Sequence, residues 1–324
     1  MFEVGFLFLG SDLVGVATTG VPTANTTEPA LWGLVGNTPL VPVNTGAVGD
    51  TGARLFVKAE WLNPGGSVKD RPAREIMRAG IAEGALPSRR LLDASSGNTA
   101  VAYAMLGAAA RIGVTVCVPA NASPERFRLL ALCGAEVIET DPLEGSDGAI
   151  RRAREMAEAA PERYWYPDQY GHRANPDSHY RTTGPEIWRQ TEGAVTHLVA
   201  GVGTSGTLMG AGRFLREMRS DIRLISVEPD SPFHGLEGLK HMATAMVPNI
   251  YDPSLIDETI FVDTESAESK VRALARDQGL LVGWSTGAAL VAADLVLGEH
   301  ALVVIIGPDG AGRYLSETRR WLED

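Results

Sequence analysis

Residues 63–72 read NPGGSVKDRP, in which a loop with two glycines leads to Lys69 at the charged start of an expected helix. The chain has only four lysines among its 29 basic residues, so a lysine in this loop stands out. A lysine that is partly shielded from water can lose its proton and form an imine with a carbonyl group, which arginine cannot do. Lys69 is therefore the candidate for a covalent role. Taken alone, its position is better explained by a solvated charge at a helix start, because most lysines are solvated.

Outward from this loop, short β-branched runs alternate with helical patterns, which is typical of parallel βαβ units. The pattern predicts strands at residues 91–94, 114–118, 135–140, 197–200, 222–227, 280–283 and 301–306. It predicts helices at residues 99–112, 124–133, 146–159, 208–218 and 288–297. Gly113 is expected to end the first helix in a left-handed conformation. We therefore expect an α/β protein.

The composition excludes several classes of protein. A chain of 324 residues, 44% hydrophobic and 21% charged, is expected to form two globular domains. A net charge of -11 argues against a nucleic-acid partner. No long apolar run is present and no basic residue precedes Arg54, so neither a membrane span nor a signal peptide is expected. Cys117 and Cys133 are expected to be core thiols in a reducing, cytoplasmic compartment, with no metal site.

Polar residues gather at four expected junctions between a strand and the next helix, at residues 95–99, 201–207, 283–288 and 307–315. In open α/β sheets, ligands bind at the carboxyl ends of the strands, so these junctions are expected to line one cleft. The first junction, SSGNT, offers hydroxyl groups and free backbone N–H groups at a helix start. That combination suits a carboxylate.

The junction at residues 201–207, GVGTSGT, has two interpretations. Its first six residues match the pattern G-x-G-x-x-G, and Glu228 ends the next strand, as in a nicotinamide dinucleotide site. Its hydroxyl side chains favour instead a cup for one terminal phosphate. The motif alone leaves both interpretations open.

An imine-forming lysine, a carboxylate site, a phosphate cup and a serine turn together fit pyridoxal 5'-phosphate. The chain resembles the fold-type II pyridoxal-phosphate enzymes, in particular the cysteine synthase and cystathionine β-synthase group. The resemblance rests on GNTPL at residues 36–40, PGGSVKDRPA at 64–73, SGNT at 96–99, TTGPE at 182–186, GTSGT at 203–207 and RYLS at 313–316.

This resemblance implies two three-layer α/β/α domains with mostly parallel central sheets and the cofactor in the cleft between them, as in the tryptophan synthase β-subunit. Residues 1–30 would form an N-terminal arm. Residues 57–167 would form a smaller, mobile domain, and residues 31–56 with 168–324 a larger domain that binds the cofactor phosphate. A homodimer is also implied.

The resemblance also implies roles for single residues. Lys69 would form the internal aldimine and later move protons, Asn98 would hydrogen-bond the ring 3'-oxygen, and Ser285 would face the pyridine nitrogen. The residues that would hold the phosphate are Gly203, Thr204, Ser205, Gly206 and Thr207. The residues that would bind the amino-acid carboxylate are Ser95, Ser96, Thr99 and Gln169.

The implied reaction is β-replacement on an O-activated serine, most simply O-acetylserine and sulfide giving L-cysteine and acetate through an aminoacrylate. Alternatives that stay open are homocysteine as the nucleophile, giving cystathionine, and the use of O-phosphoserine or thiosulfate. A nicotinamide-dependent oxidoreductase using residues 201–206 is a further alternative.

The chain departs from the group's pattern at several positions. Ala94 and Ser95 stand where Pro-Thr is usual, Ala100 where glycine is usual, and Trp284 where an aliphatic residue is usual. Residues 228–235 contain no arginine, although relatives specific for O-phosphoserine place one near there. This absence argues against a phosphorylated donor.

Overall fold

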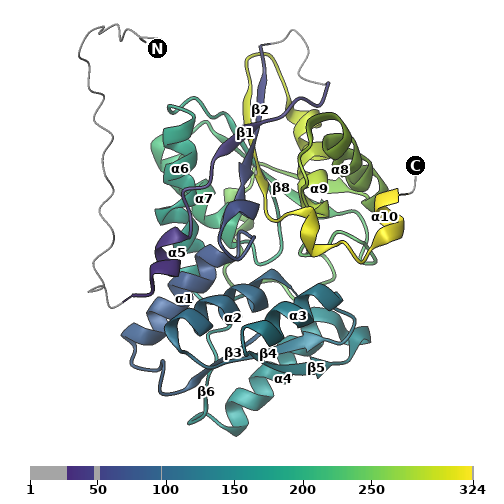
Figure 1. Ribbon diagram of the computed structural model, residues 1–324. Coiled ribbons are helices and arrows are strands. Elements are labelled where there is room, and N and C mark those ends of the chain that lie inside the picture. Colours follow the sequence, from purple (N-terminus) through teal and green to yellow (C-terminus); the bar gives the residue numbers. More distant parts are fainter. Residues whose placement is uncertain (1–27, 47–51, 96, 323–324) are drawn as a thin grey trace, which may run out of the picture.

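The computed structural model describes residues 28–46, 52–95 and 97–322. Ser96 and nearly all of the arm expected at residues 1–30 lie outside the described residues. Two β-sheets organise the described chain, one of six strands and one of four (Figure 1). Each sheet is covered by helices on both faces, so the expected α/β class is confirmed.

The six-stranded sheet has the strand order β1-β2-β10-β7-β8-β9, and only β1 is antiparallel to its neighbour. Its strands are β1 (Leu40–Pro42), β2 (Arg54–Ala59), β7 (His197–Gly201), β8 (Arg223–Pro229), β9 (Glu258–Val262) and β10 (Leu302–Gly307). The strand β10 is buried along its whole length, as expected for the centre of a sheet covered on both faces.

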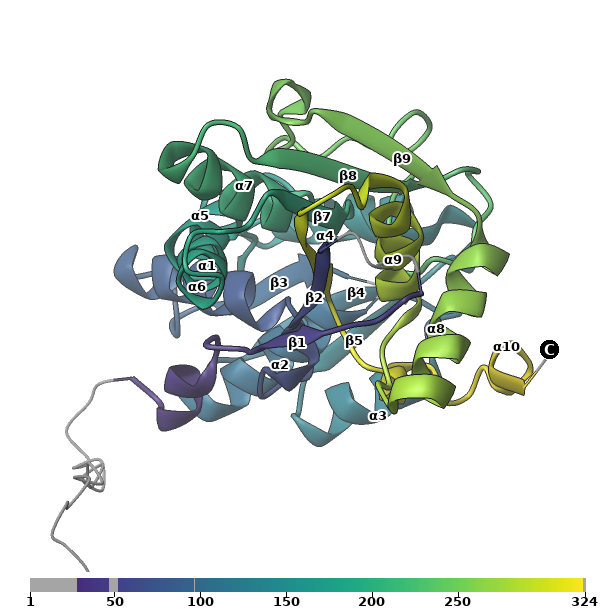
Figure 2. The same ribbon diagram turned by 90° about the horizontal axis from the view of Figure 1, so that it is seen from above.

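Successive residues of these strands point to opposite faces and so supply two separate cores. On one face, Val303 and Ile305 pack with α8 (Thr264–Gln278) and α9 (Trp284–Val296). On the other, Leu302 and Val304 pack with helices that include α6 (Thr183–Gln190) and α7 (Gly206–Met218). Figure 2 shows α7 and α9 on opposite sides of the sheet. We call this sheet and its helices the large-sheet unit.

The four-stranded sheet is parallel throughout, in the order β5-β4-β3-β6. Its strands are β3 (Arg90–Ala94), β4 (Val114–Pro119), β5 (Glu136–Thr140) and β6 (Tyr164–Trp165). The helices α2 (Asn98–Ala110) and α3 (Pro124–Leu132) belong to the core on one face, and α4 (Gly145–Ala159) to the core on the other. This is the small-sheet unit.

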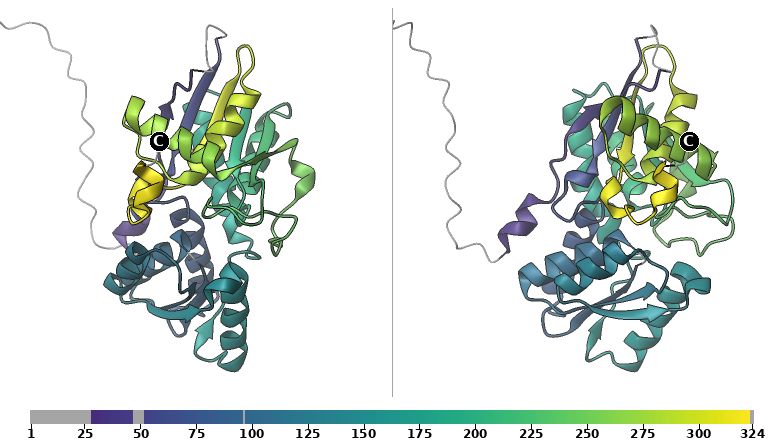
Figure 3. Two further views of the ribbon diagram at one scale, coloured as in Figure 1. Left: turned by 90° about the vertical axis from the view of Figure 1, so that its right-hand side faces the viewer. Right: turned by 45° about the vertical axis from the view of Figure 1, so that its right-hand side comes forward.

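The two units lie one above the other, with the large-sheet unit uppermost (Figure 3). The helix α1 (Asp70–Ala82) joins them, because it packs against both α2 and α5 (Ala174–Arg181). The described chain ends with α10 (Thr318–Leu322) beside α8. Single-turn 3-10 helices occupy Ala30–Leu34, Glu60–Leu62, Pro142–Glu144, Pro253–Leu255 and Ala311–Arg313.

Two local predictions are wrong. The apolar run at residues 280–283 forms no strand, and only Val282 makes an isolated bridge, to Gly310. These residues are a short crossing between α8, which ends at the left-handed Gly279, and the start of α9. The helix α2 ends earlier than expected, so Arg111 and not Gly113 takes the left-handed conformation, with φ 57°.

The strand β2 pairs with β10 as far as Ala59, so a domain boundary at residue 57 would cut this strand. The division into two domains therefore stays a proposal, to which we return below. Across the ranges that the structure describes, no helix combines the length and the apolar character needed to cross a bilayer.

Candidate active site

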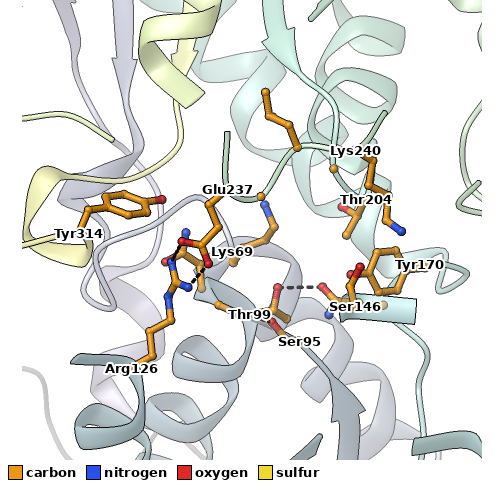
Figure 4. Close-up of a pocket in the computed structure, with 16 residues that line it drawn as sticks. Lys69, Ser95, Thr99, Arg126, Ser146, Tyr170, Thr204, Glu237, Lys240 and Tyr314 are labelled. Carbon is orange, nitrogen blue, oxygen red and sulfur yellow. Dashed lines mark hydrogen bonds and ion pairs between the residues drawn. The ribbon is translucent and has the colours of Figure 1, made fainter. Parts of the chain in front are cut away.

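A pocket lined by Lys69, Asn98, Thr99 and Gln169, among other residues, lies between the two units (Figure 4). We call it the main pocket. The small-sheet unit contributes residues just beyond β3, the helix α3 and the first turn of α4, and the large-sheet unit contributes residues just beyond β7 and the loop at residues 237–240. A second, adjoining pocket is lined in addition by residues beyond β10 and by the first turn of α9. The four polar junctions therefore meet at one place, where the sequence predicted one cleft.

Lys69 lies in both pockets, at the residue before α1. Of the four lysines, Lys69 is the only one whose ammonium group has no hydrogen-bond or ion-pair partner among the described residues. Burial lowers the pKa of Lys69 below its ordinary value, although the carboxylates of Asp309 and Glu60 oppose this effect. A lysine that is easily deprotonated and faces a pocket is suited to imine formation.

The other three lysines are engaged elsewhere. Lys58 is fully buried and donates hydrogen bonds to Glu186 at 2.7 Å and to Gln190 at 2.9 Å. Lys270 forms an ion pair with Asp294. Lys240 lines the main pocket, and its ammonium lies 3.3 Å from a carboxylate oxygen of Asp147. These contacts single out Lys69 as the available amine.

Asn98 opens α2 and lines the same two pockets as Lys69. Its Nδ2 donates to Asp309 at 2.6 Å, and the hydroxyl of Tyr314 donates to the same carboxylate oxygen at 2.7 Å. Burial raises the pKa of Asp309, and these two hydrogen bonds oppose the rise. The second carboxylate oxygen of Asp309 and the Asn98 Oδ1 are buried without a partner among the described residues.

Residues 203–207 form a tight turn between β7 and α7. Ser205 is in the left-handed conformation with φ 69°, and its hydroxyl is buried without a partner in the described chain. A Cβ on Gly203 would lie 2.1 Å from the carbonyl oxygen of Gly238, and one on Gly206 would lie 2.0 Å from Oδ1 of Asn175. The turn therefore requires glycine at residue 203, where the neighbour is a backbone atom, whereas a Cβ at residue 206 would force the Asn175 side chain to move.

Two side chains of α5 contact the hydroxyl groups of this turn. Asn175 Nδ2 lies 3.2 Å from the hydroxyl of Thr204, and His179 Nε2 lies 3.3 Å from that of Thr207. Burial lowers the pKa of His179 to about 3, so the ring is neutral near pH 7. A neutral turn that presents backbone N–H groups and hydroxyls at the start of a 13-residue helix suits an anion.

Ser285 is 4% exposed and lines the second pocket together with Lys69 and Asp309. The preceding Trp284 is absent from the residues that line the described pockets. Its indole N–H donates to Glu317 at 3.1 Å, and its ring lies 4.0 Å from that of Trp321. Trp284 is therefore a packing residue for the C-terminal segment and does not change the shape of the pocket wall directly.

The expected carboxylate site is held by a chain of hydrogen bonds. The hydroxyl of Thr99 donates to Gln169 Oε1 at 2.8 Å, and Gln169 Nε2 donates to the carbonyl oxygen of Ala94 at 2.6 Å. Ser95 Oγ accepts from the N–H of Gly97 at 3.2 Å. Ser95, Thr99 and Gln169 all line the main pocket, whereas Ser96 lies outside the described residues.

The sequence interpretation missed several lining residues, namely Arg126, Ser146, Tyr170, Glu237 and Lys240, whereas Tyr314 lies in the junction at residues 307–315 that was expected to line the cleft. Arg126 in α3 is almost fully buried and pairs with Glu237 of the large-sheet unit, and its guanidinium lies 5.7 Å from the centre of the Tyr314 ring. None of the five missed residues forms a motif, so only their positions in space bring them to the pocket.

Comparison with known proteins agrees with this geometry. A model of the family described as pyridoxal-phosphate dependent enzymes matches residues 31–309. The chain belongs to this family. It is 46% identical over 292 residues to a cysteine synthase of Aquifex aeolicus, covering 87% of this chain and 89% of the relative. The family match favours a phosphate cup over a dinucleotide turn at residues 201–206.

Two solved structures of the family are also similar. A cysteine synthase from Entamoeba histolytica superposes with a TM-score of 0.84 at 31% identity, covering 99% of this chain and 95% of the other. An O-acetylserine dependent cystathionine β-synthase from Helicobacter pylori superposes with a TM-score of 0.82 at 34% identity, covering 88% and 96%. The predicted fold and the predicted cofactor, pyridoxal phosphate, are thus confirmed.

Proposed function

We propose that this protein joins a sulfur nucleophile to the β-carbon of an O-activated serine, most simply converting O-acetylserine and sulfide into L-cysteine and acetate. The observation that carries the proposal is the unpartnered Lys69 between an anion cup and a hydroxyl-rich carboxylate site. The similarity to cysteine synthases over most of both chains supports the same reaction.

The polar atoms without partners in the described chain fit pyridoxal phosphate. We propose that the turn at residues 203–207 holds the phosphate, with the Ser205 hydroxyl and the start of α7 as donors. Asn98 and Ser285 line the same pocket as Lys69 and would hold the ring of the cofactor. When bound, the cofactor withdraws electrons from the α-carbon of the amino acid, which makes the α-proton acidic.

The side chains of the pocket then have separate tasks. Ser95, Thr99 and Gln169, together with Ser96, would bind the carboxylate of the donor and fix its orientation. Lys69, once its amine is released, would remove the α-proton. The Cβ–O bond would break and acetate would leave with the electron pair. Sulfide would then form the Cβ–S bond, and Lys69 would return the proton to the α-carbon. Closure of the two units would exclude water from this step.

The proposal is tested with purified holoenzyme, O-acetylserine and sulfide. We expect L-cysteine and acetate in equal amounts, with loss of the donor only when the cofactor is bound. Formation of pyruvate and ammonia alone, without cysteine, would show elimination and not replacement. No turnover of O-acetylserine with any thiol would overturn the proposal.

A second candidate is the formation of cystathionine with homocysteine as the nucleophile. The similarity to the O-acetylserine dependent cystathionine β-synthase favours this candidate. Competition between sulfide and homocysteine in one reaction mixture distinguishes the two, since the ratio of products reports the preferred nucleophile.

Three further proposals concern the division into domains, the cellular location and the oligomeric state. The two sheets support a division into two domains, with the first boundary after Ala59 and not at residue 57. The thiols of Cys117 and Cys133 are free, which is compatible with a reducing, cytoplasmic location. We propose a homodimer from the family resemblance, and light scattering of the purified protein tests it.

A further inference from the structure

A buried carboxyl group, that of Asp93, lies directly behind the expected carboxylate site. Asp93 is the penultimate residue of β3 and is fully buried, on the face of the strand that packs against α2. It lines neither the main pocket nor the second pocket. Within the described part of the chain, no ion pair joins it to a cation. A charged carboxyl group in such a place costs free energy unless hydrogen bonds stabilise it.

Three groups donate hydrogen bonds to Asp93. The N–H of Ala94 donates to one carboxylate oxygen at 2.8 Å. The hydroxyl of Tyr103 and the N–H of Gln169 donate to the other oxygen at 3.0 Å and 3.2 Å. Tyr103 follows Thr99 by four residues, so both side chains point to the same face of α2. Asp93 therefore connects the end of β3, the helix α2 and the segment that contains Gln169.

These hydrogen bonds continue into the carboxylate site. The side chain of Gln169 donates to the carbonyl oxygen of Ala94 at 2.6 Å and accepts from the hydroxyl of Thr99 at 2.8 Å. Asp93 thus holds the backbone of Gln169, and Gln169 holds both ends of the stretch from Ala94 to Thr99. Because Thr99 and Gln169 line the main pocket, a displacement of Gln169 would displace the groups that face the donor.

The charge of Asp93 decides how well it keeps these partners. All three partners donate, and an ionised carboxylate only accepts. A protonated carboxyl group has to place its O–H against one of these donors, and its remaining hydrogen bonds are weaker. Burial raises the pKa of Asp93 to about 7, although the hydrogen bonds from Ala94, Tyr103 and Gln169 oppose this rise. Asp93 therefore changes its charge near neutral pH.

Other titratable groups lie around Asp93 on α2, on β4 and on the segment after β6. They are Tyr103, Cys117, Tyr166, Asp168 and Tyr170. Burial raises the pKa of all three tyrosines, and it raises the pKa of Cys117 to about 11. The charge of Asp168 raises the pKa of Asp93 further, and Asp168 itself pairs with Arg154 of α4 at 3.0 Å. Neither the tyrosines nor Cys117 ionises near pH 7, so Asp93 is the group that changes its charge there.

We propose that Asp93 is a positioning residue for the amino-acid donor: its carboxylate holds Gln169, and through Gln169 it orients Thr99 and the neighbouring groups that bind the donor's own carboxylate. The proposal rests on the proposed β-replacement. It adds that a side chain outside the pocket controls the affinity for the donor, and that this affinity falls as Asp93 takes up a proton. The two carboxylates repel each other, so the gain from orientation has to exceed this repulsion.

The first experiment measures KM for O-acetylserine and kcat at saturating sulfide, with the wild-type holoenzyme and with Asp93→Asn. At about pH 8.5, Asp93→Asn should raise KM by about tenfold and change kcat by less than about twofold, since hydrogen bonds to a charged group are lost. At about pH 5.5 the wild-type group is neutral as well, so the two KM values should differ by less than about twofold. Comparison at each pH cancels the other ionisations of the donor and the pocket.

A difference in KM that is the same at both pH values would show a merely structural role, and the proposal would be wrong. A lower KM in Asp93→Asn at the higher pH would mean that repulsion dominates, which would overturn it as well. Glu228→Gln is the matched control. Glu228 lies near the end of β8, is 5% exposed and accepts the N–H of Met242 at 3.1 Å, but it lines neither pocket. Its KM relative to the wild type should not depend on pH.

The second experiment tests whether Asp93 acts through Gln169. Gln169→Ala keeps the backbone N–H that donates to Asp93 but removes the side chain that reaches Ala94 and Thr99. In the Gln169→Ala background, Asp93→Asn should raise KM by less than about twofold at about pH 8.5, because both changes interrupt the same chain of contacts. Effects that multiply would show that Asp93 acts independently of Gln169, contrary to the proposal.

Tyr103→Phe tests the role of the charge even if Asp93→Asn does not fold. It removes one hydrogen bond from the carboxylate, so the pH at which donor affinity falls should move upward by about one unit. Equilibrium titration of the holoenzyme with L-alanine measures this affinity, because L-alanine has the α-carboxylate but no leaving group. A midpoint equal to that of the wild type would contradict the proposal.

These outcomes differ from a failure of the proposed function. If O-acetylserine and sulfide give no cysteine with the wild-type holoenzyme, the β-replacement is wrong, and the titration with L-alanine still tests Asp93. If cysteine forms normally and neither Asp93→Asn nor Tyr103→Phe changes the pH dependence, only the role of Asp93 is wrong.

Discussion

Lys58 is fully buried and Lys69 is partly buried, and the two lysines differ in what faces their ammonium groups. The ammonium of Lys58 is enclosed by Glu186, Gln190 and a backbone carbonyl; burial lowers its pKa as well, but Glu186 opposes this effect directly. The ammonium of Lys69 faces a pocket, and burial lowers its pKa. Burial without a partner favours the neutral amine, which is the form that attacks a carbonyl.

We predict that Lys69→Ala and Lys69→Arg lose the covalent attachment of the cofactor and essentially all turnover. Alanine has no amine, and arginine keeps the charge but cannot form an imine. Borohydride reduction followed by peptide mass spectrometry measures the attachment. Label on a peptide that contains Lys58, Lys240 or Lys270 in the wild-type protein would contradict the assignment. Lys270→Ala is the control and should label at Lys69 like the wild type.

At the scale of elements, the turn between β7 and α7 is set by contacts with α5. Asn175 donates to the carbonyl oxygen of Gln169 at 2.8 Å and to Thr204 at 3.2 Å, so one side chain connects the carboxylate site with the phosphate cup. It is only 1% exposed and has little room to move. The position of Gly206 against Asn175 therefore matters for both binding sites.

We predict that Gly206→Ala weakens cofactor binding. The added Cβ would lie 2.0 Å from Asn175 Oδ1, so Asn175 has to move and its two hydrogen bonds are disturbed. Overpacking costs about 1–3 kcal/mol, which corresponds to a dissociation constant that is higher by about 5-fold to 150-fold. Equilibrium titration of the apoprotein with pyridoxal phosphate measures it. Gly312→Ala, where a Cβ meets nothing within 4 Å, should bind like the wild type.

A buried charge network joins the 3-10 helix Glu60–Leu62, which follows β2, with α1 and α6. Glu60 accepts hydrogen bonds from Thr38 at 2.6 Å and from two nitrogens of Arg71 at 2.7 Å and 2.8 Å, and Arg71 in turn donates to Glu186. Burial alone would raise the pKa of Glu60, but the charge and hydrogen bonds of Arg71 hold it at about 2. The folded protein therefore binds a proton at Glu60 less readily than the unfolded chain does.

We predict that Glu60→Gln lowers the free energy of unfolding at pH 7 by about 3 kcal/mol, because it leaves Arg71 without full compensation. Since the pKa of Glu60 is depressed in the folded state, its contribution is present above about pH 4.5 and is lost as the pH falls towards about 2. Urea unfolding of both proteins at several pH values should therefore show a difference that narrows in acid.

An exposed glutamate provides the control for this measurement. Glu258 pairs with Arg223 on the surface, where both side chains are more than a third exposed, so Glu258→Gln should change stability by less than about 1 kcal/mol. A constant difference between Glu60→Gln and the wild type from pH 7 to pH 3 would show that the network is not held by the charge of Glu60.

At the scale of the whole molecule, the loop at residues 237–240 makes two ion pairs of opposite polarity with the small-sheet unit. Glu237 pairs with Arg126 of α3, and Lys240 pairs with Asp147 of α4. Figure 4 shows Arg126 and Lys240 on opposite sides of Lys69. One short loop of the large-sheet unit therefore contacts the small-sheet unit on both sides of the pocket.

We predict that Glu237→Gln raises KM for the donor by about fivefold and changes kcat less. Glu237 is 30% exposed, so its pair with Arg126 contributes only about 1 kcal/mol to keeping the units together. Steady-state kinetics with saturating sulfide measures both constants. A loss of kcat at unchanged KM would instead place Glu237 in the chemical step. The Glu258→Gln variant should show wild-type constants.

Much of the fold and part of the candidate site could be predicted from local sequence. The strands at residues 91–94 and 114–118, the glycine-rich turns and Lys69 are encoded by short patterns, because strand burial, helix starts and tight turns depend on neighbouring residues. The family match confirmed the fold and the cofactor that these patterns indicated. The run at residues 280–283 was misread because an apolar crossing between two helices has the composition of a buried strand.

Only the tertiary structure decided which of four lysines remained without a partner and what surrounds the rest of the pocket. Arg126 and Glu237 are separated by more than a hundred residues, and so are Asn98 and Asp309. Such pairs leave no periodic signal in the chain, since their energy comes from burial and charge between two separately formed units. The sequence by itself determined the elements and the chemistry of the turns. The packing of the two units decided how those groups face one another. It also decided how far each pocket side chain is removed from water, because this depends on every element that closes the pocket.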